Sequence, residues 1–259
     1  MKRRAKKALK TAFIPILTTV IIQLIVSNAI ALLTSSFTNM LMHIPNIDPY
    51  TYQLAVFILS TLVAIFIYAP LIVGTTKLIL DSSRLKPVDY TIILQPFKKE
   101  YYLKTVKAMS VRMFIAQILS QMMAVFARLY YFIYINQRFP ELPKTVSGNT
   151  VVIFSAAFML LSIFLIIKSF DYFLVEYIVA DNPEIKLCEA LKKSKNYMNG
   201  NRFATLILAF SLIGWYLLGF IAFLVGIIFV QVYMQAIIAQ LYFELSDENN
   251  IIHYTCEDV

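Results

Sequence analysis

Long apolar runs alternate along this chain with short polar segments. The apolar runs cover residues 11–33, 54–80, 108–134, 151–167 and 203–245. At about 1.5 Å of rise per helical residue, the first four each match one crossing of a hydrocarbon core that is about 30 Å thick. The last run is about twice as long as one crossing needs, so we interpret it as two spans joined by a tight turn near residues 218–226. The pattern predicts an all-α polytopic transmembrane helix bundle of about six spans.

The polar segments predict how these spans are connected. The helical pattern of the fourth span continues through residues 168–179 and stops at Asp181-Asn182-Pro183. Pro70 and Gly74 predict a kink near the end of the second span. We expect a single integral membrane domain over residues 1–259, which consists of a basic interfacial segment at 1–10, a bundle at 11–245 and an acidic inner tail at 246–259. Within the bundle, outer loops are expected at 34–53 and 135–150. Inner connections with interfacial amphipathic helices are expected at 81–107 and 183–202.

The positive charge sets the expected orientation. Eighteen of the 23 Lys and Arg residues fall within 1–10, 77–107 and 186–202. Basic residues close to membrane spans stay on the cytoplasmic side, so we expect both termini inside the cell. Contact with anionic lipid headgroups then explains the net charge of +8 without a nucleic-acid partner.

Composition supports a membrane protein and gives no sign of an enzyme. The chain is 59% apolar and 15% charged, whereas a soluble domain is about 45–50% apolar and about 25% charged. We expect the run at 11–33 to be retained as a span rather than cleaved as a signal peptide. The sequence has no P-loop, HExxH or GxSxG motif, and its few thiols and imidazoles lack metal-ligand spacing, so we expect no catalytic residue, cofactor or metal; these residues are Cys188, Cys256, His43 and His253.

Amide side chains recur within three of the predicted spans, and each is costly in hydrocarbon unless it is partnered. They are Gln23 and Asn28, Gln117 and Gln121, and Gln231 and Gln235. One interpretation is a polar pathway for a small solute or a peptide. The other, which we favour, is hydrogen bonding between helices, because neutral amides alone make a poor ion-coupling site.

A small charged group follows the fourth apolar run. Lys168 precedes Asp171 by three residues, so the two are expected to pair along one helix face, with Glu176 nearby. A proton relay is one interpretation, and charges tolerated at the inner water interface are the other, which we favour. Arg128 is expected to reach the outer headgroups.

The most specific pattern lies in the last part of the chain. It comprises Tyr177-Ile178-Val179-Ala180-Asp181-Asn182-Pro183, Ala190–Ser194, Met198-Asn199-Gly200, Phe210–Trp215 and Leu241–Leu245. Together with the basic opening, these segments resemble the bacterial integral membrane family known as domain of unknown function 975. The resemblance implies a multi-pass protein of the bacterial cytoplasmic membrane and supplies no catalytic residue. The chain departs from the family at Val232, where a proline before Tyr233 would be expected.

These family-like residues have a structural interpretation. Pro183 ends a helix, and a following amphipathic helix is expected to turn Ile185, Leu187, Leu191 and Ser194 toward the membrane and Lys192, Lys193 and Lys195 toward water or lipid phosphates. Gly200 supplies a turn into the fifth span. Gly214, beside Trp215, is expected to allow close helix approach.

Two classes of function fit the sequence. The leading hypothesis is a non-enzymatic accessory protein that acts through lipids, a membrane protein partner or a second copy of itself, in peptide export, bacteriocin immunity or envelope maintenance. The alternative is a small-solute or peptide transporter or permease subunit that uses the amide positions and the region of Asp171 and Glu176. A role in lipid handling is a third possibility.

Overall fold

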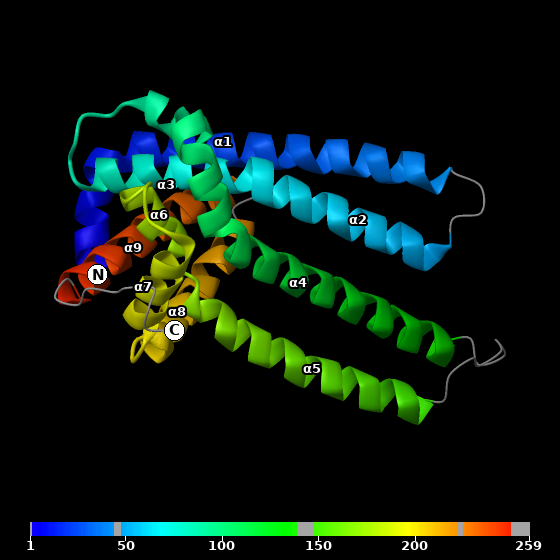
Figure 1. Ribbon diagram of the computed structural model, residues 1–259. Helices are drawn as coiled ribbons and strands as arrows, with labels where there is room; N and C mark the ends of the chain where they lie inside the picture. The colour runs from blue at the N-terminus through cyan, green and yellow to red at the C-terminus, as the bar shows by residue number, and fades with distance from the viewer. Residues whose placement is uncertain (1, 44–47, 139–147, 222–224, 250–259) are drawn as a thin grey trace.

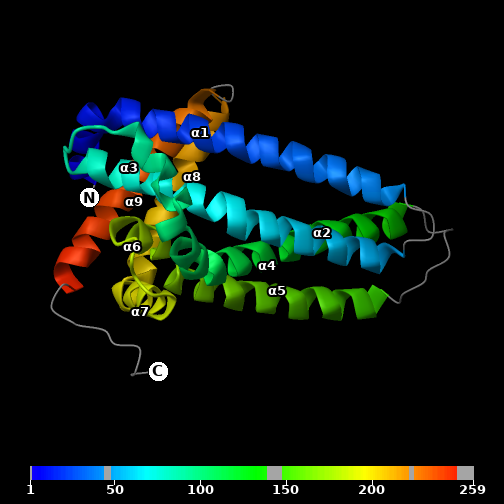
Figure 2. The same cartoon turned by 45° about the horizontal axis from the view of Figure 1, so that its top comes forward.

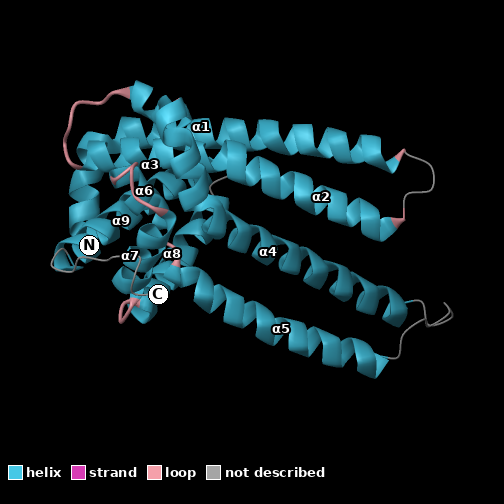
Figure 3. Cartoon of the chain, in the orientation of Figure 1, coloured by secondary structure: helices cyan, strands magenta, loops and turns pink. Residues whose placement is uncertain are grey.

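The computed structural model describes residues 2–43, 48–138, 148–221 and 225–249. Helices and short loops make up these residues, and no strand occurs among them (Figure 3). The α-helices are α1 (Lys2–Met42), α2 (Pro49–Val63), α3 (Ala69–Ser83), α4 (Lys99–Arg138), α5 (Gly148–Asp171), α6 (Val175–Asp181), α7 (Leu187–Met198), α8 (Arg202–Ile221) and α9 (Val225–Asn249). A π-helical segment, η1 (Ala64–Tyr68), joins α2 to α3, and a 3-10 segment, η2 (Tyr90–Phe97), precedes α4. The all-α prediction is confirmed.

Six stretches of the described helices are long and apolar enough to cross a membrane. They are Ala12–Leu41, Thr51–Ser83, Lys99–Phe126, Ala156–Asp181, Arg202–Phe220 and Gly226–Asp247. The expected number of spans is therefore confirmed, including the division of residues 203–245 into two. The chain is a multi-pass membrane protein by the length and composition of these helices.

The helices form long arms that extend from one end of the molecule, the packed end, where α3, α6, α7 and α9 gather. In Figure 1 the outer parts of α1, α2, α4 and α5 extend away from this end. The hairpin of α8 and α9 lies at the packed end and runs obliquely to α1 (Figure 2). The beginning of α1 and the end of α9 lie at the packed end, and α1 packs against both α3 and α9.

The predicted outer loop at 34–53 is much too long. Helix α1 continues to Met42 and α2 begins at Pro49. The hydroxyl of Thr34 donates to the carbonyl of Ile30 at 2.9 Å and that of Thr38 to the carbonyl of Ser35 at 2.8 Å. Because such bonds satisfy hydroxyls within their own helix, a Ser- and Thr-rich segment remains helical. The connection at 81–107 is also shorter than expected, since α4 begins at Lys99.

The proline in the second span is accommodated by the π-helical segment that precedes it. The N–H of Ala69 donates to the carbonyl of Ala64, five residues earlier. Pro70 has no N–H to offer the carbonyl of Phe66. The hydroxyl of Tyr102 donates to that carbonyl instead, at 3.0 Å. A π-helical segment therefore precedes Pro70, and a side chain from α4 supplies the hydrogen bond that the proline cannot make.

Gly74 has a different role from the kink that the sequence predicts. It lies within regular α3, where a Cβ atom would fall only 2.1 Å from the carbonyl oxygen of Ile93. The backbone of η2 therefore lies directly against this position. Gly74 is needed for the close approach of two segments and not for a bend.

The continuation of the fourth span forms the centre of the packed end. Helix α5 ends at Asp171, a turn covers Tyr172–Leu174, and α6 follows as a separate short helix. Leu174 and Val175 are completely buried, and Val179 is nearly so. They pack in one core with residues of α1, α3, α4, α7 and α9. This segment lies inside the protein.

Candidate functional site around α6

Three carboxylates between residues 171 and 181 pair with three arginines from three other segments. Asp171, at the end of α5, pairs with Arg202 at the start of α8. Glu176 of α6 pairs with Arg112 of α4, and Asp181 at the end of α6 pairs with Arg84, which follows α3. The α6 region is thus connected by charge to α3, α4 and α8.

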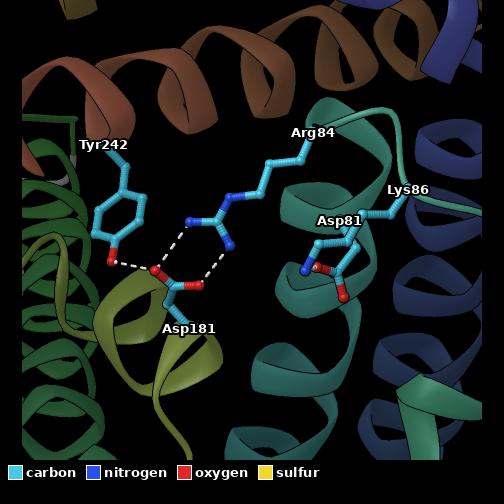
Figure 4. Close-up of polar contacts among 5 residues, drawn as sticks. All are labelled: Asp81, Arg84, Lys86, Asp181 and Tyr242. Carbon is cyan, nitrogen blue, oxygen red and sulfur yellow. Dashed lines mark hydrogen bonds and ion pairs between the residues drawn. The ribbon is translucent and has the colours of Figure 1, made fainter. Parts of the chain in front are cut away.

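The pair at the end of α6 is a two-pronged contact (Figure 4). Arg84 donates from Nη1 to Oδ1 of Asp181 at 2.6 Å and from Nη2 to Oδ2 at 2.9 Å. Tyr242 of α9 donates its hydroxyl to Oδ2 at 3.1 Å. The guanidinium of Arg84 also lies 5.0 Å from the ring centre of Phe243. The hydrogen bond to Asp181 raises the pKa of Arg84, so this arginine keeps its charge.

A tight turn directs the neighbouring charges to separate partners. Leu85 has a φ of 59°, in the left-handed region, and the N–H of Lys86 donates to the carbonyl of Asp81 at 3.1 Å. This turn ends α3 and lets Lys86 donate to the buried carboxylate of Asp81 at 3.0 Å, while Arg84 reaches Asp181 (Figure 4). A non-glycine residue in this conformation costs of order 1–3 kcal/mol, which its surroundings must offset.

The predicted pairing of Lys168 with Asp171 is wrong. Lys168 lies with its Nζ 5.8 Å from the ring centre of Phe164, and Arg202 brings Nη2 within 2.7 Å of Oδ1 of Asp171. The side chain of Asp171 is only 3% exposed, and its backbone carbonyl accepts a hydrogen bond from Ser194 of α7 at 2.8 Å. The break after α5 brings α7 and α8 to this carboxylate, which spacing along one helix cannot reveal.

Glu176 lies in α6 and points to a partner in another helix. Its pair with Arg112 is mostly shielded, since the two side chains are 14% and 22% exposed. A cavity of about 210 Å³ lies beside Arg112, and Tyr68 and Tyr172 also line it. Glu176 is therefore part of a helix-to-helix ion pair next to a small cavity, near the end of the candidate span Ala156–Asp181.

The first amide group joins three helices. Gln235 of α9 donates to Oε1 of Gln23 in α1 at 2.8 Å, and Gln23 donates to the hydroxyl of Thr75 in α3 at 2.7 Å. The hydroxyl of Thr19 also approaches Oε1 of Gln235 at 3.4 Å. These bonds explain why α1 packs along both α3 and α9.

The other amides are divided among separate contacts. Gln117 of α4 donates to the hydroxyl of Ser60 in α2 at 2.6 Å, and Tyr216 of α8 donates to Gln231 of α9 at 2.6 Å. Asn28 donates to a carbonyl of its own helix, that of Leu24, at 2.8 Å. Gln121 is half-buried one turn beyond Gln117. The expected amides therefore do not lie along one continuous pathway.

The amphipathic helix after Pro183 is confirmed, but its apolar face is turned differently from the prediction. It is α7, and Ile185 before it and Ser194 within it are buried in the protein core rather than facing lipid. Ser194 is fully buried, and its hydroxyl is satisfied by the carbonyl of Asp171 at the end of α5. Gly200 has a φ of +80° in the turn before α8, as expected.

Gly214 does not provide the expected close approach. No atom from another described segment lies within 4 Å of a Cβ built there. Gly219 provides it instead, because a Cβ there would meet the backbone of Gly226 at 3.1 Å. Trp215 packs with its ring centre 5.7 Å from that of Tyr233. The α8–α9 hairpin is therefore closest near its turn.

Some sequence predictions fall outside what the structure describes. These are the residues Cys256 and His253, the tail beyond residue 249, the turn at 222–224, and the side chain of Arg128. Among the described residues, no three His, Cys, Asp or Glu side chains gather as a metal site would require.

Sequence reasoning missed the arginine partners and Tyr242. Arg84, Arg112 and Arg202 each stand at or near an end of an apolar run, and acidic residues recur at 171, 176 and 181. These two patterns together could have suggested ion pairing, because charges near lipid need partners. They could not have said which arginine meets which carboxylate.

Comparison with known proteins places the chain in a family. The family described as "Protein of unknown function (DUF975)" matches residues 1–249, so the chain belongs to it. No curated protein and no solved structure matches the chain.

Proposed function

We propose that this member of the DUF975 family is a non-enzymatic accessory protein that acts in the membrane through lipids or a membrane protein partner. The observation that supports this proposal is the use of charged and amide side chains within the described spans to join helices. Such a bundle presents a fixed surface to the surrounding lipids and to other membrane proteins. The roles that would use such a surface are peptide export, bacteriocin immunity and envelope maintenance.

The ion pairs around α6 favour a fixed bundle over a moving one. Removing one partner of a buried pair costs about 3–5 kcal/mol, because the other charge stays buried without compensation. A transport cycle that separated Glu176 from Arg112, or Asp171 from Arg202, would incur a free-energy cost of this kind every time the protein changed conformation. These residues therefore serve best as permanent connections.

We place the protein in the bacterial cytoplasmic membrane, with both termini inside. Lys192, Lys193 and Lys195 lie on α7, and Arg84 and Lys86 follow α3. These elements gather at the packed end together with the beginning of α1 (Figure 1). Because basic residues close to membrane spans tend to stay on the cytoplasmic side, this end faces the cytoplasm and contacts anionic lipid headgroups.

Deletion of the gene tests the proposed function. The expected result is a changed sensitivity to cationic peptides and bacteriocins, a change in peptide export, or a weaker envelope, with recovery when the full chain is restored. A complementing variant with Lys192, Lys193 and Lys195 changed to Gln should restore less, since it weakens the contact with anionic lipid. An unchanged phenotype in all of these assays would reject the proposal.

A second candidate function, a small-solute or peptide permease subunit, is favoured by the cavity beside Arg112 and Glu176. Flux into proteoliposomes tests it with Ala116→Phe, which narrows this cavity. Loss of flux with normal folding would support transport. Equal flux in the wild type and the variant would reject the cavity as a pathway.

A further inference from the structure

An apolar groove of about 320 Å³ lies between α5, α8 and α9. Phe170 of α5, Leu208 and Leu212 of α8, and Ile238 of α9 contribute to its walls. It lies on three candidate spans, so lipid chains surround it in a membrane. Its volume is at the lower end of the range of about 300–1,000 Å³ for ligand pockets.

One polar residue on the groove has an unsatisfied hydroxyl. Thr205 lines the groove and is 4% exposed, and its hydroxyl has no hydrogen-bond partner. Many hydroxyls in the described spans bond back to their own helix, as Thr19 does to Ile16 and Thr75 to Leu71. Those of Ser82, Ser83 and Thr105 also lack a partner, but these residues do not line the groove. The hydroxyl of Thr205 is therefore available to donate to, or accept from, a group bound in the groove.

A further polar atom without a partner belongs to a residue next to Thr205. Arg202 lies one turn before Thr205 on α8 and pairs through Nη2 with Oδ1 of Asp171, while its buried Nε has no hydrogen-bond partner. A buried polar atom without a partner costs about 1–3 kcal/mol, so the Nε of Arg202 and the hydroxyl of Thr205 need an explanation. The side chain of Arg202 is also 41% exposed, which leaves donors of its guanidinium accessible.

The groove and its polar corner together have the chemistry of a lipid site. An apolar channel suits an acyl chain, the partly exposed guanidinium of Arg202 suits a phosphate, and the hydroxyl of Thr205 suits a hydroxyl of a headgroup. An α-helix is about 10 Å wide with its side chains, which is too wide for a groove of this volume. An anionic glycerophospholipid with hydroxyls in its headgroup meets all three requirements.

We propose that this groove binds an acyl chain of phosphatidylglycerol, with its phosphate on Arg202 and its headgroup hydroxyls toward Thr205. The site rests on the proposed function, since it names a lipid through which the protein would act. It also gives α8 a second contact, because its main packing is otherwise against α9.

Native mass spectrometry of the full chain tests this site. The protein is reconstituted in nanodiscs of phosphatidylglycerol and phosphatidylcholine, released into mild detergent, and its retained lipids are counted. Ala209→Phe fills the groove, and Ala204→Phe is the matched control on the same helix, since Ala204 is exposed and does not line the groove. Arg202→Lys keeps the charge but loses the forked donor, and Thr205→Val removes only the hydroxyl.

The wild type and Ala204→Phe are expected to retain phosphatidylglycerol over phosphatidylcholine. Ala209→Phe should lower this preference about tenfold, which corresponds to about 1.4 kcal/mol. Arg202→Lys and Thr205→Val should lower it by smaller factors.

Equal retention in Ala209→Phe and the wild type would overturn the site while leaving a lipid-dependent function intact. No preference for phosphatidylglycerol in the wild type would count against the proposed function itself as well. A dimer that Ala209→Phe dissociates, with lipid retention unchanged, would assign the groove to a second copy of the chain and overturn the lipid site.

Discussion

Helix α5 and the segment from Asp171 to Asp181 follow one another and are both rich in apolar residues, yet their surroundings are opposite. In α5, Leu160 is 66% exposed and Phe164 is also largely exposed. In the following segment, Leu174 is fully buried, and Tyr177 and Val179 nearly so. The difference follows from charge, because the buried segment carries three carboxylates that need partners.

This difference shows what hydropathy can and cannot specify in a membrane protein. Lipid tails are as apolar as leucine, so an apolar side chain gains little by leaving lipid for protein. A carboxylate gains much by meeting an arginine in the same surroundings. The ion pairs therefore decide which apolar segment becomes the centre of the bundle.

The largest change is expected from removing one charge beside α6. Arg112→Leu leaves Glu176 without its partner and should cost about 3–5 kcal/mol in thermal unfolding followed by Trp215 fluorescence. Lys104→Leu is the control, since Lys104 pairs with Glu184 at 3.6 Å on the exposed surface. The control should cost at most about 1 kcal/mol. Equal losses would contradict the special position of α6.

A Leu→Ala substitution should lower the stability more in the segment from Asp171 to Asp181 than in α5. Leu174→Ala opens a cavity in the core and should cost about 2–5 kcal/mol. Leu160→Ala exchanges one lipid contact for another and should change the free energy of unfolding little. Similar losses in both variants, measured by unfolding in detergent, would mean that α5 also packs against protein.

A smaller change is expected from a glycine at a close approach. Gly74→Ala places a methyl group against the backbone of Ile93 and should cost about 1–3 kcal/mol by overpacking. Gly214→Ala has open space around it and should leave the unfolding temperature unchanged or slightly raised. A tolerated Gly74→Ala with full stability would show that η2 does not lie on α3.

The smallest change is expected from the amide contacts. Gln235→Leu removes the donor to Gln23 and should cost about 0.6 kcal/mol, the average for such bonds between membrane helices. Asn28→Leu is the control, because Asn28 bonds only within its own helix in the described contacts. If Gln235→Leu lowered the free energy of unfolding by several kcal/mol, the amide contacts would stabilise the bundle as much as the ion pairs do.

The sequence predicts the helices better than it predicts their contacts. The number of spans and the turn at Gly200 follow from hydropathy and backbone chemistry. The length of α1 was missed because Thr34 and Thr38 are polar in the sequence but bond within the helix. The partner of Asp171 was missed because helical spacing favours Lys168, whereas the turn at residues 172–174 brings α8 to it. Contacts between distant segments depend on such turns, which a single sequence does not specify.

The pair of Arg112 and Glu176 offers the most direct test of the account. If arginine–carboxylate pairs hold the α6 region in place, the two substitutions Arg112→Leu and Glu176→Leu should be coupled. Each single variant is expected to be strongly destabilised, and the double variant should recover most of the lost stability, because no charge remains buried alone. Losses that simply add in the double variant would contradict it.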